Sequence, residues 1–132
     1  MGRRLKELDS DVDIISVGCT DFVPLIESGH IYDELIRKSA ESYLAPIKEF
    51  GVDTLILGCT HYPMLMKSIE RAVPAGTKII PQGNLVVESL EKYFECHPDM
   101  DARCSKNGTT RFMTTENPER FKQCAQLFLH TD

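Results

Sequence analysis

The chain has 132 residues, of which 42% are hydrophobic and 27% charged, a composition typical of a globular domain. Its formal net charge of −5 and scattered basic residues argue against a nucleic-acid surface, which needs clustered Lys and Arg. No apolar stretch is as long as a membrane span, and none follows the first positive charges, so we predict neither a membrane protein nor a secretory signal. We expect a cytoplasmic protein whose five cysteines are free thiols, since their number is odd and their spacing irregular.

The first part of the chain predicts a short helix, a buried strand and a long helix. Leu5 and Leu8 have helical spacing but no capping residue before them, which suggests that chain is missing upstream. The β-branched run Val12–Val17 predicts a strand. A helix is expected from about Tyr32 to Glu49, and Gly51 is expected to terminate it in the left-handed conformation. Its apolar positions recur at three- and four-residue steps: Tyr32, Leu35, Ile36, Tyr43, Leu44 and Ile47.

Strands and helices continue to alternate in the rest of the chain. Strands are expected at Thr54–Leu57, Lys78–Ile80 and Arg111–Thr114, and Pro63 suits the first turn of a helix. Asn84 is expected to cap a helix that buries Val86, Val87, Leu90, Tyr93 and Phe94. The polar stretch Glu95–Gly108 is expected to be a loop, and Asn117-Pro118 to begin a last helix through Leu129. The alternation predicts an α/β protein with a parallel sheet and flanking helices, which binds ligands at the carboxyl ends of its strands.

Two Gly-Cys-Thr triplets follow predicted strands, at Gly18–Thr20 and Gly58–Thr60. The second leads into a helix N-terminus, which favours a thiolate, and places His61 two residues from Cys59. A Cys–His pair at such a turn suits acid–base or nucleophilic chemistry. Cys19 has Asp21 nearby instead, and a carboxylate raises the pKa of a thiol, so Cys19 is the weaker candidate.

Two other interpretations of the cysteines and histidines remain open. A cysteine after a buried strand is often a small core residue, and a nearby histidine is often scaffold. Cys96, His97, Cys104 and Cys124 could bind a metal, but their spacing matches no common zinc motif, and we predict no metal site.

The segment DTLILGCTHYP, Asp53–Pro63, resembles the second catalytic-cysteine motif of glutamate racemases, within the aspartate/glutamate racemase superfamily. The segments FVPLIESG at Phe22–Gly29 and RFMTTENPERFKQCAQLFL at the end of the chain are also similar to family segments. The resemblance implies that Cys59 is one of two acid–base cysteines and that His61 assists its proton transfer. It further implies that Thr60 binds the substrate carboxylate and that Glu27 has an auxiliary role, whereas Cys19 is not used for catalysis.

The sequence also departs from the family pattern. The family's Asp-Ser-Gly segment and its Cys-Asn-Thr motif, which supplies the other catalytic cysteine, do not occur here, and Ile80–Gly83 replaces a commonly acidic segment. The resemblance therefore implies a C-terminal portion of a two-domain racemase. Residues 1–83 would form part of the second α/β domain, and residues 84–132 would complete the first. We expect such a chain to be a poor or an inactive racemase by itself, and to self-associate or swap domains because apolar helix faces are exposed.

The resemblance implies an isomerase that interconverts L- and D-glutamate without cofactor or metal, supplying D-glutamate for peptidoglycan, cell-wall biogenesis and cell shape. Its partner would be the small-molecule substrate, with no nucleic acid or membrane. Two alternatives remain: an aspartate racemase-like member of the superfamily, or a non-catalytic binding or regulatory module.

Overall fold

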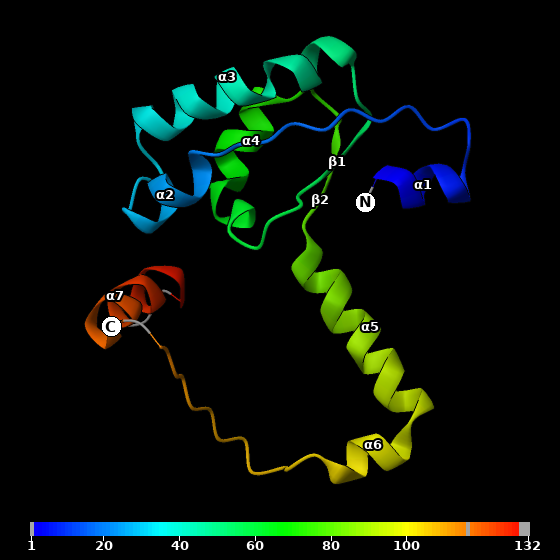
Figure 1. The fold of residues 1–132 in the computed structure, drawn as a ribbon, viewed down its shortest axis with the longest axis vertical. Helices are drawn as coiled ribbons and strands as arrows, with labels where there is room; N and C mark the ends of the chain where they lie inside the picture. Colours follow the sequence, from blue (N-terminus) through cyan, green and yellow to red (C-terminus); the bar gives the residue numbers. More distant parts are fainter. Residues whose placement is uncertain (1, 116, 130–132) are drawn as a thin grey trace. The chain divides into compact units, whose positions relative to one another are not determined.

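The computed structural model describes residues 2–115 and 117–129 (Figure 1). The chain divides into two compact units, Met1–Ile80 and Pro81–Asp132. The division lies close to the predicted boundary after residue 83. The assignment of residues 84–132 to another domain of the racemase family remains a prediction.

The first unit contains a two-stranded parallel sheet with helices. Strands β1 (Thr54–Ile56) and β2 (Lys78–Ile80) pair in the register Thr54 to Lys78, Leu55 to Ile79 and Ile56 to Ile80. The helices are α1 (Gly2–Leu8), α2 (Phe22–Glu27), α3 (Glu34–Phe50), the 3₁₀ helix η1 (Tyr62–Leu65) and α4 (Met66–Ala72). The parallel pairing and the helix between the two strands confirm the predicted α/β class.

Two of the four predicted strands are not formed. Val12–Val17 and Arg111–Thr114 have no strand assignment, so these predictions were wrong. Both segments have residues that favour strands, but a strand exists only where a neighbour completes its hydrogen bonds. A sequence pattern shows that residues favour a strand, but it does not show whether a neighbouring strand is present to pair with them.

Helix α3 forms much as predicted, with both ends fixed by local chemistry. Its N-cap is Asp33, whose side chain accepts the Ile36 N–H at 3.1 Å, so the helix begins after Tyr32. Gly51 ends it in the left-handed conformation, with φ of 72°. The buried face consists of Ile36, Ala40, Leu44 and Ile47, and the helix packs against α4. Tyr32 and Leu35, which were predicted to share this face, are exposed.

The second unit is helical, with α5 (Gln82–Cys96), α6 (Pro98–Arg103) and α7 (Pro118–Leu129). Asn84 is not the predicted cap, because α5 has already begun at Gln82. The predicted loop at Glu95–Gly108 contains α6, which contacts α5. Helix α7 begins as predicted: Asn117 Oδ1 accepts the N–H groups of Glu119 at 2.9 Å and Arg120 at 3.2 Å.

Helix α5 carries an exposed apolar surface, here called the α5 apolar face. Its members are between 42% and 63% exposed: Leu85, Val86, Val87, Leu90 and Tyr93. The amphipathic pattern was read correctly, but the predicted burial is absent. No described residue of α5 is buried.

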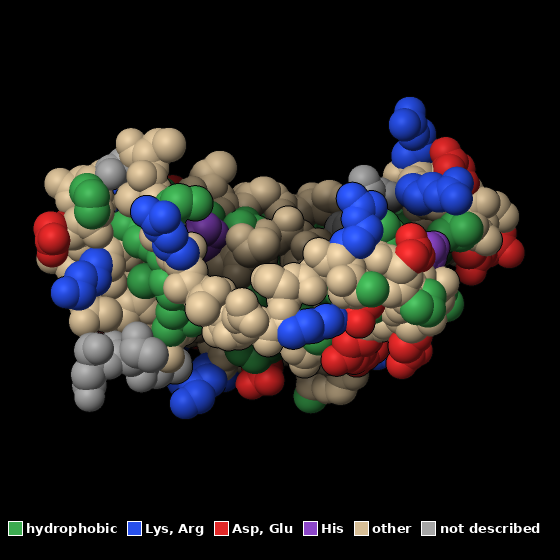
Figure 2. Space-filling view, turned by 90° about the horizontal axis from the view of Figure 1, so that it is seen from below, with side chains coloured by type: hydrophobic (Ala, Val, Ile, Leu, Met, Phe, Trp, Pro, Cys, Tyr) green, Lys and Arg blue, Asp and Glu red, His purple; other side chains and the backbone are tan. Residues whose placement is uncertain are grey.

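Basic side chains are scattered on the face of the molecule that Figure 2 shows. In Figure 2 the Lys and Arg side chains stand singly or in small groups among acidic and uncharged ones. Among the described helices, none is long and apolar enough to cross a membrane.

Candidate active site

The predicted active-site cysteine lies just beyond the carboxyl end of β1. The N–H of the buried residue Leu57 donates to Ile80 O at 3.1 Å, which fixes the end of the strand. The chain then turns, and the Tyr62 N–H donates to Cys59 O at 3.2 Å. Cys59 is half-buried at this turn, so its thiol is held by the backbone yet remains accessible.

Three of the predicted site residues come together around His61. Its Nδ1 lies 3.8 Å from Cys59 Sγ, and its Nε2 lies 3.5 Å from Glu27 Oε1. Glu27 is the last residue of α2, so the contact joins two segments far apart in sequence. Thr60 is exposed between Cys59 and His61.

This order of groups can move a proton. An imidazole that directs Nε2–H toward the Glu27 carboxylate presents the Nδ1 lone pair to the Cys59 thiol. Nδ1 can then accept the thiol proton, and the carboxylate stabilises the imidazolium that results. The arrangement thus places a proton acceptor beside a thiol at the carboxyl end of a parallel strand.

The helix that follows Cys59 is shorter than predicted. Pro63 does lie in a first helical turn, but that turn is the four-residue 3₁₀ helix η1, followed by the seven-residue α4. The dipole of such short helices is small. The groups around His61 are therefore the main electrostatic feature of the site.

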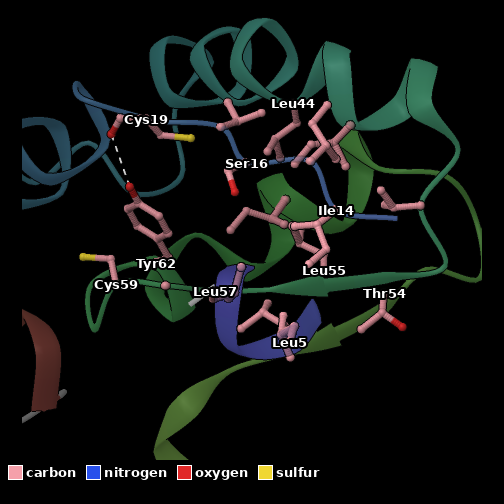
Figure 3. A pocket seen from close by; sticks show the side chains of 18 of the residues that line it. Leu5, Ile14, Ser16, Cys19, Leu44, Thr54, Leu55, Leu57, Cys59 and Tyr62 are labelled. Carbon is pink, nitrogen blue, oxygen red and sulfur yellow. Dashed lines mark hydrogen bonds between the residues drawn. The ribbon is translucent and has the colours of Figure 1, made fainter. Parts of the chain in front are cut away.

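Tyr62 is a neighbour of the site that was not singled out from the sequence. Its hydroxyl donates to Cys19 O at 3.4 Å, and Figure 3 shows its ring between Cys19 and Cys59. Partial burial raises the pKa of Tyr62, and the nearby Cys19 and Cys59 raise it further. In the sequence, only its position directly after His61 indicated that Tyr62 lies near the site.

Cys19 is buried in the core of the unit. Burial raises the pKa of its thiol, which is the predicted direction but has a different cause. The Asp21 carboxylate instead accepts a hydrogen bond from the Tyr43 hydroxyl at 2.8 Å. The thiol of Cys19 is thus less easily ionised than an exposed one.

The remaining cysteines lie in the second unit. Cys96 and Cys104 are exposed, and the Cys104 thiol donates to Met100 O at 3.5 Å. His97 stacks on Tyr93 with ring centroids 4.2 Å apart. Within residues 2–115 and 117–129, no three His, Cys, Asp or Glu side chains are grouped to hold a metal ion.

These observations define the class: an α/β protein with a carboxylate–imidazole–thiol array at the carboxyl end of a parallel strand. No protein-family model matches the chain. A glutamate racemase from Shouchella clausii is 38% identical over 130 residues, which are 97% of this chain and 46% of that protein. One from Gloeothece citriformis is 32% identical over 134 residues, 95% of this chain and 44% of that protein.

Comparison with solved structures also finds glutamate racemases. The crystal structure of glutamate racemase from Francisella tularensis in complex with D-glutamate matches 99% of this chain and 48% of that chain, with a TM-score of 0.85 and 26% identity. The chain is therefore related to the glutamate racemase family over nearly its whole length. It spans about half the length of the curated relatives it matches.

Proposed function

We propose that this chain takes part in the interconversion of L- and D-glutamate, with Cys59 as the acid–base group for one face of the substrate. The observation that carries the proposal is the contact of Cys59 with His61 and of His61 with Glu27. Two further facts support it: the sequence relatives are named glutamate racemases, and the structurally similar Francisella tularensis enzyme was crystallised with D-glutamate.

In the proposed reaction the Cys59 thiolate removes the α-proton of glutamate and becomes a thiol. His61 takes the thiol proton beforehand, and Glu27 stabilises the charged imidazole. Thr60, exposed beside the thiol, binds the substrate carboxylate. The reaction uses no cofactor and no metal.

Inversion needs a second acid that returns a proton to the opposite face of the α-carbon. The sequence has no Cys-Asn-Thr motif to supply it. The second thiol therefore comes from outside residues 1–132, and these residues alone do not racemise glutamate. The full reaction would supply D-glutamate for peptidoglycan in the cytoplasm, and so serve cell-wall biogenesis and cell shape.

Self-association of the isolated chain is part of this proposal. The α5 apolar face exposes five large side chains on a single helix, and exposed apolar surface of this kind favours association or domain swapping. Light scattering is expected to show oligomers whose proportion grows with concentration. A single monomeric species over the whole range would contradict this.

The test of function is α-proton exchange of L- and D-glutamate in D₂O, followed by NMR. The chain alone is expected to exchange one enantiomer at most. Adding the part of the Shouchella clausii enzyme that this chain does not match should produce racemisation. Cys59→Ala should abolish it, whereas Cys96→Ala, which removes an exposed thiol, should not. Racemisation by the chain alone, or by the Cys59→Ala mixture, would contradict the proposal.

A further inference from the structure

Tyr62 links the two Gly-Cys-Thr triplets of the first unit. Its hydroxyl donates to Cys19 O at 3.4 Å, the contact that Figure 3 draws as a dashed line. Its backbone N–H donates to Cys59 O at 3.2 Å. One residue therefore contacts the backbone of the turn that carries Cys59 and the backbone of a turn much earlier in the chain.

The earlier turn leads directly into helix α2. Cys19 O accepts a second hydrogen bond, at 3.3 Å, from the N–H of Phe22, which is the first residue of α2. The Phe22 ring also contacts the Tyr62 ring edge to face, with centroids 5.4 Å apart. Tyr62 thus contacts the start of α2 with both its hydroxyl and its ring, and these contacts join α2 to η1.

Helix α2 carries Glu27 at its other end. Glu27 Oε1 lies 3.5 Å from Nε2 of His61, the residue just before Tyr62. Helix α2 has six residues and no side-chain cap at its start. Such a short helix is not stable by itself, so packing contacts fix its position. The contacts of Tyr62 with the start of α2 therefore help to determine where Glu27 lies relative to His61.

The Tyr62 hydroxyl keeps its proton at the pH values at which thiols titrate. Burial raises the pKa of Tyr62 above its ordinary value, and the nearby Cys19 and Cys59 raise it further. A protonated phenol can donate a hydrogen bond, whereas a carbonyl oxygen can only accept one. Replacing Tyr62 by Phe would therefore remove a donor to Cys19 O and leave the ring in place.

We propose that Tyr62 is a positioning residue, which holds α2 against η1 so that Glu27 stays in contact with His61. That contact orients the imidazole, whose Nδ1 lies 3.8 Å from Cys59 Sγ. The inference rests on the proposed acid–base role of Cys59, but its test follows the reactivity of the thiol and not turnover.

The experiment measures the rate at which iodoacetamide alkylates each cysteine of the chain, resolved by mass spectrometry of the peptides. In Tyr62→Phe the imidazole is less often aligned to accept the thiol proton, so Cys59 should react about threefold more slowly. Cys19, which is 6% exposed, should stay unreactive in the same sample. An unchanged rate at Cys59 would overturn the proposal. Faster reaction of both cysteines would also overturn it, since the hydroxyl would then only stabilise the unit.

Tyr43→Phe is the matched control. The Tyr43 ring contacts Phe22 edge to face with the same centroid distance of 5.4 Å, and its hydroxyl donates to Asp21 Oδ2 at 2.8 Å. Tyr43 lies on α3, so its hydroxyl joins the start of α2 to α3 and not to η1. The alkylation rate of Cys59 should not change in this variant. Equal slowing by the two Tyr→Phe variants would overturn the proposal.

A second background tests whether Tyr62 acts through Glu27. Glu27→Gln removes the carboxylate charge, so adding Tyr62→Phe to it should slow the alkylation of Cys59 no further. Equal slowing by Tyr62→Phe with and without Glu27→Gln would overturn the proposal. Failure of the proposed function would be seen separately, as α-proton exchange of glutamate that Cys59→Ala does not change, with the alkylation results intact.

Discussion

Phe22 connects the core of the first unit to the candidate active site. Only 1% of the residue is exposed, and its ring makes edge-to-face contacts with Tyr43 and Tyr62, each at 5.4 Å between centroids. Such aromatic pairs contribute roughly 0.5–1.5 kcal/mol each beyond the burial of their surface. Phe22→Leu keeps a large apolar side chain but removes both contacts, so it should lower the free energy of unfolding by about 2 kcal/mol.

The assay is urea unfolding followed by circular dichroism. Since the slope for small proteins is roughly 1–3 kcal/mol per molar urea, the midpoint should fall by about 1 M. The matched control is Phe50→Leu, because Phe50 is 51% exposed at the end of α3. This control should change the free energy of unfolding by less than about 0.5 kcal/mol.

A double-mutant cycle separates the aromatic contact from simple loss of volume. The combination of Phe22→Leu with Tyr62→Leu should give a coupling energy of about 0.5–1.5 kcal/mol. Equal midpoints for the Phe22 and Phe50 variants, or a coupling energy near zero, would refute the reasoning.

Three further predictions concern the ends of helices. Asn117→Ala removes the cap of α7 and should lower the free energy of unfolding, measured by thermal unfolding, by about 1 kcal/mol. The control Asn84→Ala lies inside α5 and should be neutral or slightly stabilising. Equal effects of the two variants would contradict the assigned caps. Gly51→Ala places a side chain at φ of 72° and should lower the free energy of unfolding by about 1 kcal/mol. The control Gly83→Ala in α5 should not destabilise the protein, and the denaturant midpoints of the two variants measure the difference. Hydrogen bonds from His30 and then from a backbone N–H lower the pKa of Asp33 below 3.8, so its contribution is present above that pH and is lost as the pH falls through the lowered value. Asp33→Asn keeps a capping group and should remove this part of the acid dependence; an unchanged acid-unfolding curve would count against it.

Helix ends and strands were predicted correctly from the sequence wherever neighbouring residues decide the conformation. The end of α3 at Gly51, the strands at Thr54–Ile56 and Lys78–Ile80, and the start of α7 after Asn117 all follow from side chains within a few positions. Cys59 and His61 were found for the same reason, since they are two residues apart. The resemblance named Glu27, but only the fold shows it 3.5 Å from His61.

Contacts between distant segments decided the rest. The burial of Cys19, the position of Tyr62 between two thiols and the exposure of α5 depend on what the chain brings alongside each residue. Val12–Val17 has the composition of a strand yet remains unpaired, because the backbone groups of a strand need a partner that composition does not provide. The sequence by itself determined where helices and strands could form and which cysteine has a histidine two residues away. Only the tertiary structure decided which strands pair, which faces are buried and which groups meet, because these depend on distances between residues far apart in the chain.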